Sequence, residues 1–252
     1  MTRVLDIDLD VFVTPIHNIH ADSRIDDDAC NICPETDVKR FLENDCGLSR
    51  DNPMPGMIFE EHDEMFNGIK ALVETGHLSS PFELVHVDAH ADLGAGQWKP
   101  YEYLFTDLMH AEPEKRQDPT RGENGLNRGT VLLFLIACEW INKLHYVHHA
   151  DDGKDFSEVF LEYESATDES FFQIPRCTKQ QFDRWKPPFT NVLDLRKEWE
   201  LGPRISFEVT PLQTFSGPGF DFVFLTRSPG FTPPKADRLF DLISEYINHE
   251  QV

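Results

Sequence analysis

The apolar positions of the chain fall into short runs of the kind that form buried strands. Residues 3–13, RVLDIDLDVFV, alternate between apolar and polar positions with the period of two that a strand requires. Residues 82–87 (FELVHV) and 220–225 (FDFVFL) are nearly continuous apolar runs, which is typical of strands covered on both faces. Similar short runs predict further strands over 56–59, 143–148, 192–195 and 205–209.

Longer stretches between these runs predict helices. A helical stretch follows residue 59 and ends near Glu74, a buried helix spans 130–141, and a closing helix over 234–248 begins at a proline. Continuous apolar strands that alternate with helices predict an α/β protein. We expect a three-layer α/β/α architecture with a mostly parallel sheet.

We expect one domain over residues 1–252. Two polar or loop-like regions, 16–55 and 151–218, interrupt the pattern and are predicted to be irregular insertions in that domain. The part from 151 to 190 has several Phe and Pro residues but no clear period, so we expect loops there.

Three groups of acidic and histidine residues lie within or directly after predicted strands. The first is DAHAD, directly after 82–87; the second is DIDLD in the first strand, with three carboxylates on one face; the third is EEHD at the turn after 56–59. Their members are Asp88, His90 and Asp92; Asp6, Asp8 and Asp10; and Glu60, Glu61, His62 and Asp63. Because ligands bind at the carboxyl ends of strands in such sheets, we expect the three groups to meet.

A metal ion would neutralise carboxylates gathered in this way. Taken singly, the second group also fits a solvated acidic edge, and the third fits the acidic first turn of a helix. Taken together, they predict a metal site. The donors are rich in oxygen, with two histidines and no cysteine, which favours Mn²⁺ over zinc and a pair of ions over one.

The composition narrows the class of partner. Against 23 Lys and Arg residues stand 45 Asp and Glu residues, a net charge of −22. This charge argues against nucleic acid and against an anionic membrane surface, because both need a basic face. It would attract a cationic substrate that carries Arg or Lys, although acidity can also serve solubility alone.

No apolar run approaches the length of a membrane span, and the first ten residues have no signal-peptide pattern. The five cysteines are an odd number, which favours a reducing, cytoplasmic location. Cys30 and Cys33 form a lone C-x-x-C pair, which is a weak zinc signal, and we expect free or structural thiols.

DAHAD resembles the D-A-H-x-D metal motif of the arginase, agmatinase and formiminoglutamase family, the ureohydrolases. DIDLDV is similar to the second signature of that family, in which Asp8 and Asp10 match the paired ligands and Asp6 stands at the serine; a shift of one step would make Asp6 and Asp8 the ligands instead. EEHDE resembles the turn that carries the remaining ligand, His62. The resemblance implies an arginase/deacetylase-like fold and two Mn²⁺ ions held by Asp8, Asp10, His62, Asp88, His90 and Asp92.

The order of the motifs differs from that of the family, because the D-x-D strand has moved to the N-terminus. A parallel sheet tolerates such a permutation. The strings VLDIDLD, EEHDE, DAHADL and TRSPGFTPP resemble a branch that includes peptide arginases, which convert arginine to ornithine in ribosomally made peptides. This resemblance implies a partner, an arginine-containing precursor peptide, and release of urea.

The resemblance also implies roles at the site. Asp92 would move a proton to the leaving amine, Asp88 would bridge the metals, and the metals would lower the pKa of a bridging water. The family's guanidinium-binding Glu aligns with Thr226, so Glu60, Glu61, Asp63 or the surplus Asp6 would supply the charge. The segment 125–129 lacks the proton-relay histidine of small-molecule arginases, and contacts to a free amino acid are not visible, which favours a peptide.

Two other enzymes fit the same residues. A small-molecule ureohydrolase of the agmatinase kind shares every metal ligand and differs only in its pocket. A deacetylase-like amide hydrolase with one zinc belongs to the same superfamily but usually lacks this many carboxylates. A third, non-enzymatic interpretation is an acidic peptide-binding protein with a structural metal.

Overall fold

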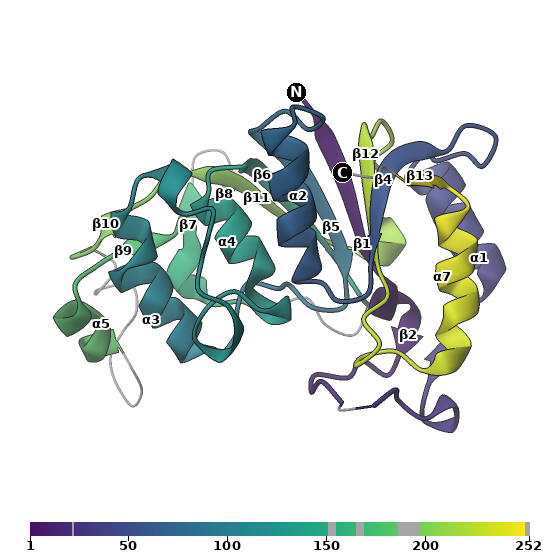
Figure 1. Cartoon of the computed structure of the whole chain (residues 1–252). Coiled ribbons are helices and arrows are strands. Elements are labelled where there is room, and N and C mark those ends of the chain that lie inside the picture. Colours follow the sequence, from purple (N-terminus) through teal and green to yellow (C-terminus); the bar gives the residue numbers. More distant parts are fainter. Residues whose placement is uncertain (22, 151–154, 165–168, 186–196, 250–252) are drawn as a thin grey trace.

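A nine-stranded, mostly parallel sheet forms the centre of the molecule in the computed structural model, which describes residues 1–21, 23–150, 155–164, 169–185 and 197–249 (Figure 1). In spatial order the strands are β13 (Ile247–His249), β4 (Met54–Phe59), β12 (Phe222–Thr226), β1 (Arg3–Asp8), β5 (Phe82–Asp88), β6 (Ile141–His148), β11 (Ile205–Pro211), β8 (Glu169–Phe172) and β7 (Leu161–Glu164). All neighbours from β13 to β11 pair in parallel, and β8 and β7 extend the sheet with antiparallel pairing.

Helices cover both faces of this sheet (Figure 1). On one face lie α2 (Glu64–Glu74), α3 (Trp98–Thr106) and α4 (Val131–Ala137); on the other lie α1 (Glu35–Arg40) and α7 (Asp237–Ser244). Strand β1 shows the alternation behind this arrangement, because Val4 belongs to the first apolar core while Leu5 and Ile7 belong to the second. The expected three-layer α/β/α architecture is confirmed.

The first strand is shorter than its sequence pattern predicts. Strand β1 ends at Asp8, and a 3₁₀ turn over Leu9–Phe12 follows. The Asp8 carboxylate caps this turn by accepting a hydrogen bond from the backbone N–H of Asp10. Asp10 therefore lies one turn beyond the strand, not on its face. A two-residue strand, β2 (Val13–Thr14), then pairs with β3 (Asn31–Ile32).

The region 16–55 is not simply an irregular insertion, as we expected. It contains α1 and a π-helical turn over Phe41–Asp45, and this helical stretch packs beside α7 on the second face of the sheet. Val38 and Leu42 are buried in that core. The sequence pattern did not reveal this helix, because its apolar side is narrow and most of its residues are polar.

The prediction of loops over 151–190 is also wrong for the described residues. Strands β7 and β8 lie there, followed by β9 (Pro175–Arg176), which pairs with β10 (Glu200–Leu201), and by α5 (Lys179–Trp185). Aromatic side chains from this region and from α3, which the pattern did not predict, form one extended group of ring contacts. The strand predicted over 192–195 lies outside the described residues.

Other predicted elements are present with altered ends. Strands β4, β5, β6, β11 and β12 are confirmed. The helix predicted over 130–141 stops at Ala137, because Ile141 already pairs with β5. The closing helix begins with a 3₁₀ turn over Pro234–Ala236, and its predicted end is strand β13. Within the described residues, no helix is both long enough and apolar enough to cross a membrane.

Candidate metal centre

The carboxyl ends of four adjacent strands bring the three acidic groups together. Asp8 ends β1 and Asp88 ends the neighbouring β5, with Ile7 paired to Val87. His62 follows β4, which joins β1 through β12, where Thr226 pairs with Asp8. The strand order therefore places residues from positions 8, 62 and 88 at one point on the sheet, as we expected from the sequence.

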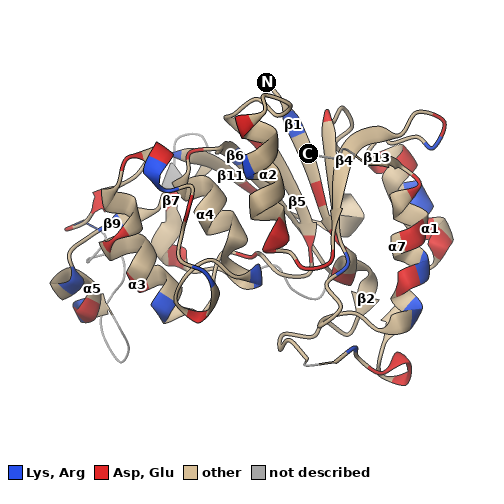
Figure 2. Ribbon diagram, viewed as in Figure 1, with Lys and Arg blue, Asp and Glu red and all other residues tan. Residues whose placement is uncertain are grey.

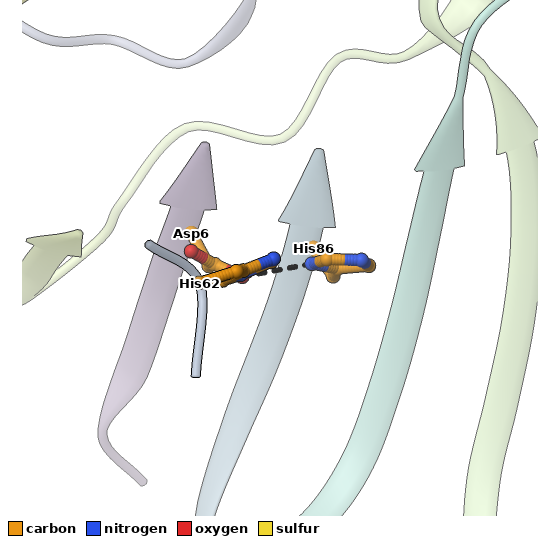
Figure 3. Close-up of side chains that lie close together, drawn as sticks. All are labelled: Asp6, His62 and His86. Atoms are coloured by element: carbon orange, nitrogen blue, oxygen red, sulfur yellow. Dashed lines mark hydrogen bonds and ion pairs between the residues drawn. The ribbon is translucent and has the colours of Figure 1, made fainter. Parts of the chain in front are cut away.

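A hydrogen-bonded group lies at the base of the site (Figure 3). The Oδ2 atom of Asp6 is 3.0 Å from Nε2 of His62 and 2.8 Å from Nδ1 of His86, and both imidazoles donate to it. All three side chains are buried. Burial alone would raise the pKa of Asp6, but the charges and hydrogen bonds of both histidines lower it, so the carboxylate stays ionised.

The second nitrogen of His62 faces three carboxylates. Its Nδ1 atom lies 2.6 Å from Asp92, 3.3 Å from Asp88 and 3.4 Å from Asp8, measured to Oδ2 in each case. Burial lowers the pKa of His62, but the charges of Asp6 and Asp92 and the hydrogen bonds to carboxylates outweigh it and raise that pKa well above its usual value. With the Nε2 proton donated to Asp6, a metal ion could replace the proton on Nδ1. Nδ1 has no partner with hydrogen-bond geometry among the described residues.

The other half of the site is built around Asp10 and His90. The Nδ1 atom of His90 lies 3.0 Å from Oδ2 of Asp10, whose other oxygen accepts from the backbone N–H of Ala89. Oδ1 of Asp88 accepts from the backbone N–H of His90. These bonds fold the DAHAD segment back over the end of β1.

Two groups of side chains at this point could each hold a metal ion. One is Asp8, His62 and Asp88, and the other is Asp10, Asp88 and His90; in each group the ligand atoms lie within 4.8 Å of one another. The two groups share Asp88. Asp92 joins Asp88 and His86 in a further group, and Asp6, His62 and His86 form another.

The buried carboxylates of these groups repel one another, so a bound positive charge would stabilise them. Burial and the neighbouring charges of Asp10, Asp8 and Asp92 raise the pKa of Asp88 well above its usual value. Burial lowers the pKa of His90, but the charge and hydrogen bond of Asp10 outweigh it and raise that pKa to about 10. A divalent cation supplies the compensation that protons otherwise give. The donor atoms therefore fit a metal ion.

A cavity of about 460 Å³ opens above the site. Its floor contains all six residues that the sequence suggested as metal ligands: Asp8, Asp10, His62, Asp88, His90 and Asp92. Ser228 also lines it and donates a hydrogen bond to Asp8. The other lining residues come from the segments 18–20, 94–97 and 127–129 and include Asp155 and Phe231.

The predicted substrate-binding residues lie elsewhere. Asp6 is buried beneath His62 and does not line the cavity, so its assignment to substrate disagrees with its position. Glu60 pairs with Arg227 at 3.1 Å, and Glu61 pairs with Arg128 at 3.2 Å; neither lines the cavity. Thr226 is fully buried at the end of β12.

Asp155 is a cavity residue that the sequence interpretation missed. Its carboxylate accepts from the backbone N–H of Ala91, at 2.9 and 3.0 Å for the two oxygens, and lies 3.5 Å from the hydroxyl of Tyr146. It is an acidic residue in the lining outside the six suggested ligands. Its position in a region without periodic pattern gave no signal, whereas His86 was hidden inside an apolar strand.

His20 is a second missed residue of the cavity wall. Its ring packs edge-on against Phe231, which in turn contacts the ring of His90. The ring of His20 occupies the space beside Gly230, where an added Cβ would lie 2.0 Å from Nε2. The glycine of the TRSPGF string thus allows the segment 18–21 to close over one side of the cavity, and Ala21 bonds to its carbonyl.

Charged residues are spread over helices on both faces of the sheet, and acidic positions also mark strands β1 and β5 (Figure 2). All five cysteines are free, and Sγ of Cys30 lies 3.2 Å from Nε2 of His17.

No protein-family model matches the chain, and comparisons with curated proteins and with solved structures give no match either.

Proposed function

We propose that the protein is a binuclear manganese amidinohydrolase that converts peptidyl arginine to ornithine and releases urea. The observation that carries the proposal is the shared position of Asp88. It belongs to one three-residue group with Asp8 and His62 and to another with Asp10 and His90, so it could serve as a ligand to two metal ions. The resemblance of DAHAD and DIDLD to the ureohydrolase motifs supports the same assignment.

The donor set favours Mn²⁺. Four carboxylates and two imidazoles, without cysteine, suit a cation that prefers oxygen and accepts nitrogen. The four carboxylates balance the charge of two divalent ions, whereas a single zinc would leave two negative charges buried. When bound, such a pair supplies a nucleophilic water of lowered pKa near neutral pH.

The remaining steps belong to side chains of the chain. Asp92 lies at the cavity floor and, in this proposal, carries a proton to the amine that leaves. Asp155 also lines the cavity and would orient the guanidinium of the substrate through charge-assisted hydrogen bonds. Ser228 and the backbone N–H of Ala89 hold Asp8 and Asp10 in place.

The acidic character of the chain supports a cationic substrate. A guanidinium keeps its charge at every physiological pH, so an acidic cavity attracts it over long range. The substrate we propose is a precursor peptide that carries arginine. We place the enzyme in the reducing cytoplasm, which five free cysteines favour. A small-molecule ureohydrolase remains the second candidate. Arg128 in the cavity wall is a cation that could bind the carboxylate of a free guanidino acid.

Metal analysis and mass spectrometry test the proposal together. The purified protein should contain two Mn²⁺ per chain after loading. Incubation with arginine-containing peptides should lower the mass of the peptide by about 42 mass units, because hydrolysis of arginine to ornithine removes CH₂N₂ from the side chain. This reaction should be faster than the release of urea from free arginine, and it should slow down at high salt. One zinc per chain, or no metal, would contradict it.

A further inference from the structure

The cavity wall contains a cation that an enzyme acting only on guanidinium would not need. Arg128 begins the 3₁₀ turn Arg128–Thr130 and lines the cavity together with Asn127 and Gly129. Among the described residues that line this cavity, it is the sole Lys or Arg. Arg128 therefore places a positively charged residue at the border of the space that would receive the guanidinium of the substrate.

The backbone that carries Arg128 is held firmly. The side chain of Asn127 accepts from the N–H of Gly129 and donates to Oε1 of Gln97, and Thr130 completes a capping box with Asn127. The carbonyl of Gly129 accepts from the N–H of Gly94, just after the DAHAD segment. The root of the Arg128 side chain therefore has a fixed position relative to the metal centre.

The guanidinium of Arg128 is only partly satisfied within the protein. Its Nη1 atom lies 3.2 Å from Oε2 of Glu61, yet it is buried and has no partner with hydrogen-bond geometry. The pair is partly exposed, with about a third of each side chain accessible, so it contributes little to stability. A guanidinium offers five N–H donors, and one carboxylate cannot use all of them.

A second guanidinium repels the first unless the substrate also carries an anion. We infer that Arg128 binds a carboxylate next to the arginine that is converted. This inference rests on the proposed function and deepens it by naming the substrate class. The carboxylate has two possible sources with the same chemistry: the terminal carboxylate of the arginine itself, or the side chain of a neighbouring Asp or Glu in a peptide.

Paired substrates that differ only in this carboxylate test the inference. The first pair is L-arginine and agmatine, the second is a peptide ending in arginine as free acid or as amide, and the third is an internal arginine beside Glu or Gln. The manganese-loaded enzyme should prefer the carboxylate of at least one pair by about 10- to 100-fold in kcat/KM. The pair that shows the preference identifies the source.

Variants connect this preference to one residue. Arg128→Gln should abolish the preference by raising KM for the substrate that carries the carboxylate. KM for the amide or for agmatine should not rise, because the repulsion between the two guanidinium groups is relieved. Arg128→Lys should restore part of the preference. Arg121→Gln is the matched control, because Arg121 pairs with Asp63 and does not line the cavity. An equal preference in wild type and Arg128→Gln overturns the inference, as does the absence of preference in all three pairs.

The failure of the proposed function gives a different result. If no guanidino compound is hydrolysed, the function is wrong, but binding still tests Arg128. Ornithine should then raise the melting temperature more than putrescine, which lacks the carboxylate, and this difference should vanish in Arg128→Gln. The same comparison is made with two ornithine peptides that carry Glu or Gln beside the ornithine. Equal shifts within both pairs in the wild type would overturn the role of Arg128 independently of catalysis.

Discussion

The Nε2 atom of His62 lies 3.0 Å from Oδ2 of Asp6, a carboxylate with no exposed surface. This contact directs the other ring nitrogen of His62 toward Asp8, Asp88 and Asp92. Loss of a carboxylate that fixes the tautomer of a metal-ligating imidazole typically lowers metal affinity by about 10- to 100-fold. Asp6 thus orients the ring of His62, although Asp6 itself does not line the cavity.

Replacing Asp6 by Asn tests this arrangement. The amide keeps the shape of the side chain but loses its charge, and it can present its NH₂ group to His62. We expect the affinity for Mn²⁺ to fall about 10- to 100-fold, as measured by competition with a metal chelator. Glu74→Gln, at the exposed end of α2, is the control. An unchanged affinity would show that His62 does not depend on Asp6.

Asp88→Asn separates metal binding from folding. Since burial and neighbouring carboxylates raise the pKa of Asp88, its charge destabilises the metal-free fold at neutral pH. The neutral variant should therefore melt at the same or a higher temperature without metal. It should not gain the stabilisation by Mn²⁺ that we expect for wild type. Retention of two ions per chain in this variant would remove the bridging role.

Asp155→Asn tests recognition of the guanidinium charge. The amide oxygen can still accept from the N–H of Ala91, so the DAHAD segment should stay in place. Wild type should bind an arginine peptide about tenfold better than its citrulline counterpart, which is neutral and of the same shape. We expect the variant to lose this discrimination in a competition assay while keeping its metal content.

Glu158→Gln is the matched control for that experiment, because it removes an exposed negative charge three residues further along the chain. If Asp155→Asn discriminates as well as wild type does, another carboxylate selects the charge. If Glu158→Gln loses discrimination equally, the net charge of the region is responsible rather than one side chain.

The contact of Arg24 with Asp237 predicts a pH effect on stability that arises outside the six suggested metal ligands. Burial raises the pKa of Asp237, but hydrogen bonds and charges of Arg24 and Arg227 outweigh it and lower the pKa below 3.8. The ionised form is therefore the more stable one in the fold. Its contribution is complete above about pH 4, the unfolded value, and is lost as the pH falls through the lowered pKa.

Urea unfolding of Asp237→Asn measures this contribution. The side chain of Asp237 is more than one third exposed, so solvent limits the loss to less than about 1 kcal/mol at neutral pH. The difference from wild type should disappear in strong acid. Asp241→Asn, on the exposed side of the same helix, should show no such trend. A difference that grows in acid would contradict the assignment.

The sequence predicted the parts of the fold that local pattern determines. The run before Asp88 could form only a buried strand, and the acidic residues after it had to lie at its carboxyl end. The same logic placed Asp8 beside Asp88 although 80 positions separate them. Asp10 was misplaced because alternation continues past the point where the Asp8 cap ends the strand.

Residues whose role depends on tertiary contacts could not be predicted in this way. His86 occupies a strand position that an apolar residue would fill equally well, and only its contact with Asp6 gives it a task. Asp155 and Arg128 come from segments without periodic pattern and meet the DAHAD segment only in the folded chain. The helix α1 has too narrow an apolar side to stand out from its polar surroundings.

The place of β12 between β1 and β4 governs when the centre can assemble during synthesis. Among the described strands, β4 pairs with β13 and β12, so the turn with His62 is not joined to β1 through the sheet until residues 222–226 have left the ribosome. Strands β1 and β5 can pair much earlier, so their carboxylates lie together before His62 joins them. Binding of metal would therefore follow the synthesis of β12, and nascent fragments without this strand would lack a complete site.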